Sequence, residues 1–207
     1  MKKALLAIVF LSMITIPVSA QEYWNLKASL NGILAKPSDS HGAAFGAAMT
    51  MTVGAPNDDY DFGFEIAKWW RSFTVPDTEV QAIDSTLAGS HHDQTGLSFS
   101  FTGRHRLYSV IENNLLDIYG GGGGGFYFLS ENRQEAGVNS VTYLPEVQKV
   151  NKYLLTKADV FVTLGFNTRI LQKLNLYWEN RYTYIFDWNE WDNPFIINSS
   201  LGLRYDF

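Results

Sequence analysis

The sequence predicts an all-β fold: a transmembrane, antiparallel, up-and-down β-barrel of eight strands. Most of the chain after residue 20 alternates apolar with small or polar residues, the period that places side chains on opposite faces of a strand. The 207 residues include 14 Phe, 11 Tyr and 6 Trp, which suits the aromatic girdles of membrane barrels. No run of about 20 apolar residues follows residue 20, so no later segment predicts a membrane-spanning helix.

The first 20 residues, MKKALLAIVFLSMITIPVSA, have the pattern of a secretory signal peptide. Lys2 and Lys3 form a positive start, an apolar stretch follows, and Val18-Ser19-Ala20 supplies the small residues of a cleavage site. We therefore expect residues 1–20 to be removed and residues 21–207 to form one outer-membrane β-barrel domain.

The charge and the cysteine content narrow the class of protein. The 16 Lys and Arg less Lys2 and Lys3 leave 14 basic residues against 21 acidic ones, a net charge of −7 for the mature chain. This balance argues against nucleic acid as a partner. The chain has no cysteine, so a secreted protein of this sequence is held together without disulfides.

Four strands are predicted in the first half of the chain, each with an apolar face opposite a small or polar one. They span residues 24–35, 43–53, 60–71 and 95–108. In order, their apolar faces carry Leu26, Leu30 and Leu34; Phe45, Met49 and Val53; Phe62, Phe64 and Ile66; and Leu97, Phe99 and Phe101. Turn-forming residues follow the second strand at Ala55–Asp59 and the fourth at Glu112–Asn114.

Four more strands are predicted at residues 115–129, 156–170, 174–186 and 195–207. The fifth strand contains six consecutive glycines, Gly120 to Gly125, and glycine in a strand often marks a bend or a close approach. The run matches the glycine pattern of a dinucleotide site, but the strand continues where that site needs a helix. We expect its inward glycines to leave room for long Arg side chains, and its outward ones to leave a shallow groove for an acyl chain.

The predicted connections alternate in length. Those after the second, fourth and sixth strands are short, whereas residues 72–94 and 130–155 form long loops. Short periplasmic turns and longer external loops are typical of outer-membrane barrels, and an even number of strands places both termini in the periplasm. The long loops are rich in charged residues, and loops on a rigid scaffold are where binding commonly occurs.

The last strand ends in LGLRYDF, in which Leu201, Leu203, Tyr205 and Phe207 share one face. With this ending, the segment DIYGGGGGGFYF, and the strands VTLGFNTRI and LYWENRYTY, the mature chain resembles the small eight-stranded outer-membrane barrels of the OmpA, OmpX and OmpW type. The resemblance implies that Tyr205 and Phe207 form the signal read by the barrel-assembly machinery.

The strand pattern directs many charged side chains into the barrel. The basic ones are Lys27, Arg71, Arg104, Arg106, Arg169, Arg181 and Arg204, and the acidic ones are Asp61, Glu65, Asp117, Asp159, Glu179 and Asp206. An eight-stranded barrel is just wide enough for side chains to fill it, and buried charges must be paired. We expect a self-neutralising network that plugs the lumen, with a narrow charged path for a small solute or a catalytic carboxylate pair as alternatives.

Other polar or aromatic groups suggest weaker sites. His91, His92 and Asp93 lie in the first long loop, and two adjacent histidines do not specify a metal site. The acidic aromatic segment Asp187–Asn193 is expected to be a loop tip, with divalent cations bridging it to lipopolysaccharide phosphates as the alternative. An outer aromatic girdle is expected from Trp69, Trp70, Phe126, Phe128, Tyr182 and Tyr184.

Together these patterns favour a non-enzymatic protein of the bacterial outer membrane that supports envelope integrity or surface recognition through its extracellular loops. A narrow pore for small solutes and a lipid A-modifying barrel enzyme are the alternatives. We expect no cofactor and no metal. The expected partners are outer-membrane lipid and lipopolysaccharide, and the barrel-assembly machinery during biogenesis, with the protein itself a monomer.

Overall fold

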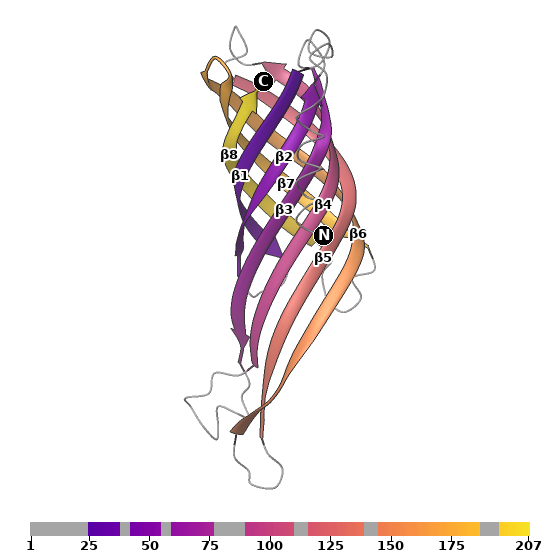
Figure 1. Cartoon of the computed structure of the whole chain (residues 1–207), viewed down its shortest axis with the longest axis vertical. Coiled ribbons are helices and arrows are strands. Elements are labelled where there is room, and N and C mark those ends of the chain that lie inside the picture. Colours follow the sequence, from indigo (N-terminus) through magenta and orange to yellow (C-terminus); the bar gives the residue numbers. More distant parts are fainter. Residues whose placement is uncertain are drawn as a thin grey trace, which may run out of the picture.

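The structure is a computed structural model that describes residues 25–37, 42–54, 59–76, 90–109, 116–138, 145–186 and 195–207. These residues form eight strands in one closed antiparallel barrel, in sequence order around the ring (Figure 1). The strands are β1 (Asn25–Pro37), β2 (Ala44–Gly54), β3 (Tyr60–Val75), β4 (Ser90–Ser109), β5 (Leu116–Val138), β6 (Pro145–Leu171), β7 (Leu174–Ile185) and β8 (Phe195–Asp206). The predicted fold class is confirmed.

The first and last strands close the ring. β1 pairs with β8 from Lys27 opposite Asp206 to Pro37 opposite Ile196. Closure of a barrel pairs the backbone groups that would otherwise form free strand edges. The described part of the chain holds no helix long and apolar enough to cross a bilayer.

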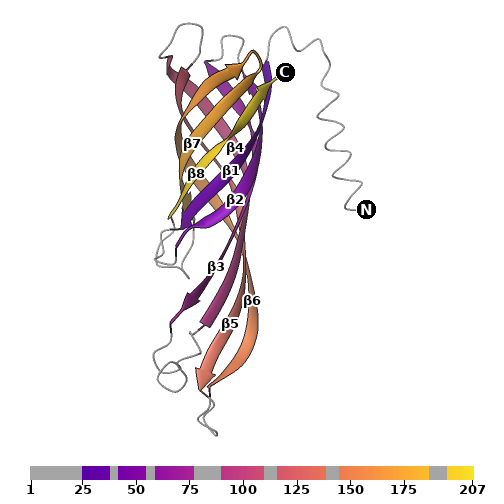
Figure 2. The ribbon, with the colours of Figure 1, turned by 90° about the vertical axis from the view of Figure 1, so that its left-hand side faces the viewer.

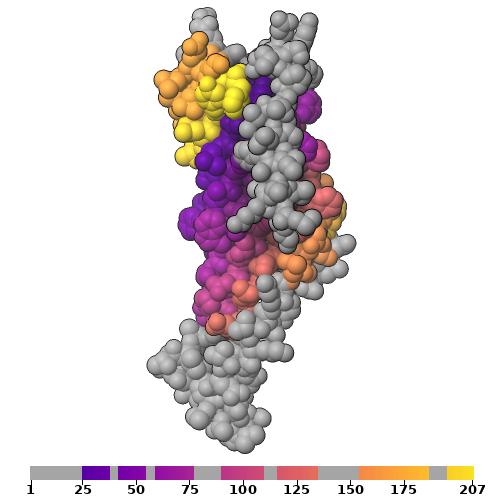
Figure 3. Space-filling view, in the orientation of Figure 1, coloured from indigo at the N-terminus to yellow at the C-terminus, as the bar shows by residue number. Residues whose placement is uncertain are grey.

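The alternation of the sequence sets which side chains face outwards. Large apolar side chains are exposed all around the barrel, among them Leu30, Phe45, Phe62, Phe64, Phe101, Phe126, Val162, Leu164, Tyr182, Leu201 and Leu203. Side chains of β1 to β4 cover one wall of the barrel without a gap where they are visible in Figure 3. A soluble protein rarely exposes so large an apolar surface, whereas a barrel in a bilayer requires one.

The two ends of the barrel differ. The C-terminus and the two-residue turn at Gln172 and Lys173 lie at one end. At the opposite end β3, β4, β5 and β6 continue well beyond the other strands (Figures 1 and 2). The predicted long loops are therefore wrong in their bounds: β3 reaches Val75, β4 begins at Ser90, β5 reaches Val138 and β6 begins at Pro145.

We call this extension the projecting sheet: residues 71–75 of β3, 90–94 of β4, 131–138 of β5 and 145–157 of β6. β2 accompanies β3 only to the pair Phe45–Trp70, and β7 meets β6 only from Asp159 onwards. Beyond those points the four strands pair only with one another among the described residues, so no other described strand pairs with the outer edges of β3 and β6 there. The sequence pattern did not predict these strand extensions because they are polar. A sheet outside the bilayer needs no apolar face towards lipid.

The glycine run brings β5 very close to its neighbours. A Cβ atom on Gly123 would collide with the backbone oxygen of Phe101 and lie 2.6 Å from the Phe161 ring. A Cβ on Gly122 would lie 2.7 Å from the backbone oxygen of Phe161. The glycines thus allow close contact between β5 and its neighbours, and Gly123 leaves space for the Phe161 ring.

Candidate functional site

The interior of the barrel is filled by three layers of side chains stacked along its axis. A charged vestibule lies at the end with the C-terminus, a layer of buried ion pairs follows, and an apolar layer lies where the projecting sheet begins. Each layer draws inward-facing positions from several strands, because alternate residues of every strand point inwards.

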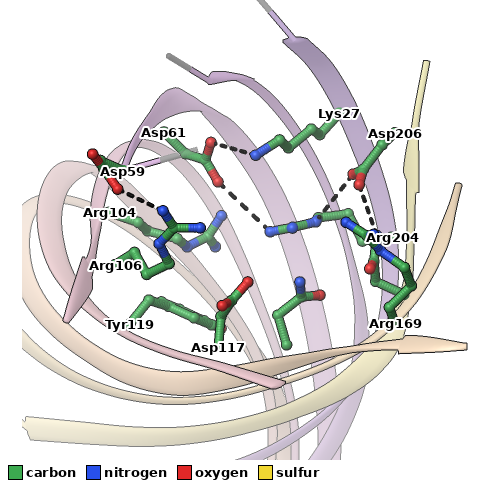
Figure 4. Close-up of a pocket in the computed structure, with 12 residues that line it drawn as sticks. Lys27, Asp59, Asp61, Arg104, Arg106, Asp117, Tyr119, Arg169, Arg204 and Asp206 are labelled. Carbon is green, nitrogen blue, oxygen red and sulfur yellow. Dashed lines mark hydrogen bonds and ion pairs between the residues drawn. The ribbon is translucent and has the colours of Figure 1, made fainter. Parts of the chain in front are cut away.

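The vestibule is an open cavity with a volume of about 480 Å³ that includes its mouth. A chain of ion pairs runs along one side (Figure 4). Lys27 Nζ lies 2.8 Å from Asp61 Oδ1, and Arg204 lies 3.6 Å from the other oxygen of Asp61. Arg204 also lies 3.4 Å from Asp206, which accepts a hydrogen bond of 2.8 Å from Asn175.

The other side of the vestibule holds Arg106, Asp117 and Arg169. Arg106 forms an ion pair of 2.7 Å with Asp59, a partner that the sequence pattern placed in a turn. Arg169 is exposed at the rim. Oδ1 of Asp117 is buried without a hydrogen-bond partner among the described residues.

The ion-pair layer crosses the barrel from wall to wall. Arg181 on β7 donates two hydrogen bonds to Glu65 on β3, of 2.5 and 2.9 Å, and one of 3.1 Å to Glu179. Arg104 on β4 donates to Glu179 at 2.9 Å. All four side chains are buried, and their two positive and two negative charges cancel.

Two stacked tyrosines support the ion-pair layer. The Tyr177 hydroxyl accepts a hydrogen bond of 2.5 Å from Arg104 and donates one of 2.7 Å to Glu179. The Tyr119 ring stacks on Tyr177, with 5.6 Å between centroids and 7° between planes. The Arg181 guanidinium lies 4.0 Å from the centroid of the Phe161 ring. These rings hold both guanidinium groups in fixed positions, a role that charge counting alone did not assign to them.

The apolar layer closes the lumen at the other end. Its larger side chains are Ile33, Trp69, Tyr127, Leu129, Ile185 and Ile196, which pack with four buried alanines. The prediction of Trp69 in the outer girdle is wrong: its side chain is 4% exposed and packs against Tyr127 inside the barrel. Trp70 points outwards, as the alternation of β3 requires.

One predicted lumen charge stands apart from both charged layers. Asp159 is 4% exposed and faces a separate cavity between the ion-pair layer and the apolar layer. No ion pair joins it to another residue in the described part of the chain.

A second cluster lies where the projecting sheet leaves the barrel. His92 belongs to β4 and not to the predicted loop; its Nδ1 lies 2.5 Å from Glu131 Oε1. Its ring stacks on Phe73, with 4.8 Å between centroids. Arg71 donates a hydrogen bond of 2.7 Å to Gln94 and lies 4.7 Å from the Phe73 centroid.

The described residues contain no group of three or more His, Asp or Glu side chains that could hold a metal ion. The segment Asp187–Asn193 lies outside the described residues, as does the signal peptide.

The end of β8 is placed for contact with lipid. Tyr205 and Phe207 are 43% and 56% exposed and form an edge-to-face pair with 5.1 Å between centroids. The backbone N–H of Phe207 donates to the carbonyl of Leu26 at 2.9 Å, so the last residue is still attached to β1.

Neither a family model nor a curated protein sequence matches the chain. Solved structures do. Neisserial surface protein A is 14% identical, with 89% of this chain and 97% of that one covered and a TM-score of 0.53. Ail, the attachment invasion locus protein of Yersinia pestis, is 12% identical, with 89% of this chain and 97% of Ail covered and a TM-score of 0.52. A major outer membrane protein from Thermus thermophilus is 9% identical, with 89% of this chain and 99% of that chain covered and a TM-score of 0.59.

The fold is that of a small eight-stranded outer-membrane β-barrel. At these identities the likeness extends to the fold alone.

Proposed function

We propose that the chain is a non-conducting, non-enzymatic barrel of a bacterial outer membrane that holds the projecting sheet outside the cell for surface recognition. One observation carries this proposal: β3 to β6 are sealed into a filled barrel along one part of their length and form an open sheet along the rest. A filled barrel makes a rigid base, and an open sheet leaves backbone groups and side chains available to a partner.

The exposed apolar belt and the structural neighbours support the location. In this proposal the belt contacts outer-membrane lipid and lipopolysaccharide, and the protein is a monomer. The signal peptide directs secretion, and Tyr205 and Phe207 are recognised by the barrel-assembly machinery. The turn end and both termini then face the periplasm.

The absence of cysteine from the sequence makes the orientation directly testable. Single cysteines are introduced at Asn132 in the projecting sheet and at Lys173 in the opposite turn, both of which are exposed. A membrane-impermeant maleimide should label Asn132→Cys on intact cells, and Lys173→Cys only after the outer membrane is opened. Labelling of Lys173→Cys on intact cells would show that the turn faces the outside, the opposite of the proposed orientation.

Recognition is tested with a trimmed variant in which short turns replace residues 72–93 and 131–155. The barrel should still fold and remain heat-modifiable on a gel. Cells displaying the full chain should bind to arrays of glycans and extracellular-matrix proteins more strongly than cells displaying the trimmed variant. Equal binding by the full chain and the trimmed variant would show that the projecting sheet is not the recognition surface.

A narrow pore is the second candidate, and the vestibule favours it. The cavity opens at the turn end and runs inwards as far as Arg104. Conduction would require the ion-pair layer and the apolar layer beyond it to open together.

A further inference from the structure

The cavity beside Asp159 has the chemistry of a cation site. It is small, with room for about one water-sized group (about 10 Å³), and it is lined by residues of β4 to β8. Arg181 lies on its side towards the ion-pair layer, and Tyr127 and Ile196 of the apolar layer lie on the other. Side chains of the two layers therefore enclose it from both ends of the barrel.

One carboxylate oxygen and one amide oxygen, both buried in this cavity, lack a hydrogen-bond donor. They are Oδ1 of Asp159 and Oδ1 of Asn198, neither of which has a partner among the described residues. The Asp159 carboxylate does accept a hydrogen bond from the backbone N–H of Gly125. Both atoms are acceptors, so the missing group must be a donor or a cation.

The charge count around the cavity also requires a positive group. Arg181 is adjacent, but its guanidinium donates to Glu65 and Glu179. With Arg104 paired to Glu179 as well, these four charges cancel and Asp159 remains as one uncompensated negative charge. Lys157 is the next inward-facing residue of β6, and no ion pair between it and Asp159 is present in the described structure. Burial of an unpaired charge is strongly unfavourable, so such a carboxylate is paired, takes up a proton or binds an ion.

We propose that this cavity binds a monovalent metal cation, with Na⁺ as the ion that fits, held by Asp159 and Asn198. The hydroxyls of Ser98, Ser100 and Thr183 also line the cavity and add oxygen atoms of the kind that hard cations prefer. A single positive charge neutralises the group, whereas a divalent ion would leave an excess charge inside the barrel.

The test compares refolding in two salts. Purified protein is refolded in detergent with sodium chloride or with choline chloride at equal concentration, since choline is too large for the site. We expect the wild type to melt several degrees higher in sodium, with a saturable dependence on sodium concentration. Equal melting temperatures in the two salts would overturn the proposal.

Two variants separate the site from a general effect of salt. Asp159→Asn keeps the shape of the side chain and removes its charge, so the sodium effect should disappear. Thr52→Val changes a buried lumen residue that does not line the cavity. This variant should still melt at a higher temperature in sodium than in choline. A full sodium effect in Asp159→Asn would also overturn the proposal.

A direct readout covers the case in which Asp159→Asn does not fold. Sodium-23 NMR of the wild type should show saturable line broadening. Asn198→Ala should shift the midpoint of that broadening at least tenfold towards higher sodium. Absence of saturable broadening in the wild type would contradict a bound sodium ion without bearing on surface recognition.

Discussion

The ion-pair layer of the barrel and the projecting sheet satisfy their buried polar side chains in different ways. In the ion-pair layer partners lie across the lumen: Arg181 on β7 reaches Glu65 on β3. In the projecting sheet the partners are on adjacent strands: Arg71 pairs with Gln94 directly opposite, and His92 with Glu131 on β5. Closure of the ring explains the difference, because only a closed barrel brings distant strands face to face.

The two kinds of contact differ in how much of the molecule their loss destabilises. Contacts across the lumen join strands that are far apart in sequence, so their loss affects the whole ring. Contacts between adjacent strands of an open sheet affect that sheet alone. We therefore expect substitutions in the lumen to change global stability, and substitutions in the projecting sheet to change local opening.

The largest effect is expected from Arg181→Ala. It removes three hydrogen bonds and leaves the carboxylates of Glu65 and Glu179 buried with too few partners. Breaking a buried ion pair from one side costs about 3–5 kcal/mol. Equilibrium urea unfolding of the refolded barrel measures this cost. Arg71→Ala at the base of the projecting sheet is the matched control, and it should lower the global free energy of unfolding by less than about 1 kcal/mol. Similar losses for both variants would show that lumen and projecting-sheet contacts contribute alike to global stability.

Gly123→Ala should be the next most damaging. The added Cβ collides with the β4 backbone and the Phe161 ring, and overpacking of this kind costs about 1–3 kcal/mol. Gly32→Ala provides the control, because its Cβ would meet only the Leu201 carbonyl at 3.8 Å. The same unfolding measurement applies, and equal stability of the two variants would show that β5 can move away from β4.

His92→Ala should loosen the projecting sheet without unfolding the barrel. The change removes the stack on Phe73 and the hydrogen bond to Glu131, together worth about 1–2 kcal/mol. Hydrogen exchange should become faster at residues 71–75 and 90–94 and remain unchanged in β1, β2 and β8. Faster exchange throughout the barrel would mean that the two regions unfold as one unit.

Phe207→Ala should have the smallest effect on the folded barrel. The side chain is largely exposed, and the hydrogen bond of its backbone N–H to Leu26 remains. Stability should change by less than about 1 kcal/mol. If Phe207 forms part of the proposed assembly signal, the amount of protein inserted into the outer membrane of cells should fall sharply. Normal insertion would argue against that role for Phe207.

The barrel was predictable because lipid outside and a filled lumen inside impose an alternation with period two. That pattern predicted eight strands and directed Glu65, Arg104, Glu179 and Arg181 inwards. It could not predict their partners, because pairing across the lumen depends on how far each strand is staggered around the ring. The alternation of β7 also places Tyr177 on the lumen face, but its two hydrogen bonds depend on that stagger.

The projecting sheet was not predictable from the same pattern. His91, His92 and Asp93 are polar, carry no apolar alternation, and resemble a loop in sequence. In the structure they belong to β4, which pairs with β3 on one side and with β5 on the other. The error at Trp69 had a different cause, since two adjacent tryptophans cannot both face lipid on one strand.

Electrical recording in a planar bilayer tests most directly whether the layered lumen is closed. The heat-modifiable wild-type barrel should give no discrete conductance steps, and the double variant Glu65→Gln/Arg181→Gln should remain silent because the apolar layer around Trp69 and Tyr127 is intact. Discrete steps from the wild type that change in amplitude when Arg104 or Glu179 is neutralised would contradict this account. They would identify the ion-pair layer as the filter of a pore.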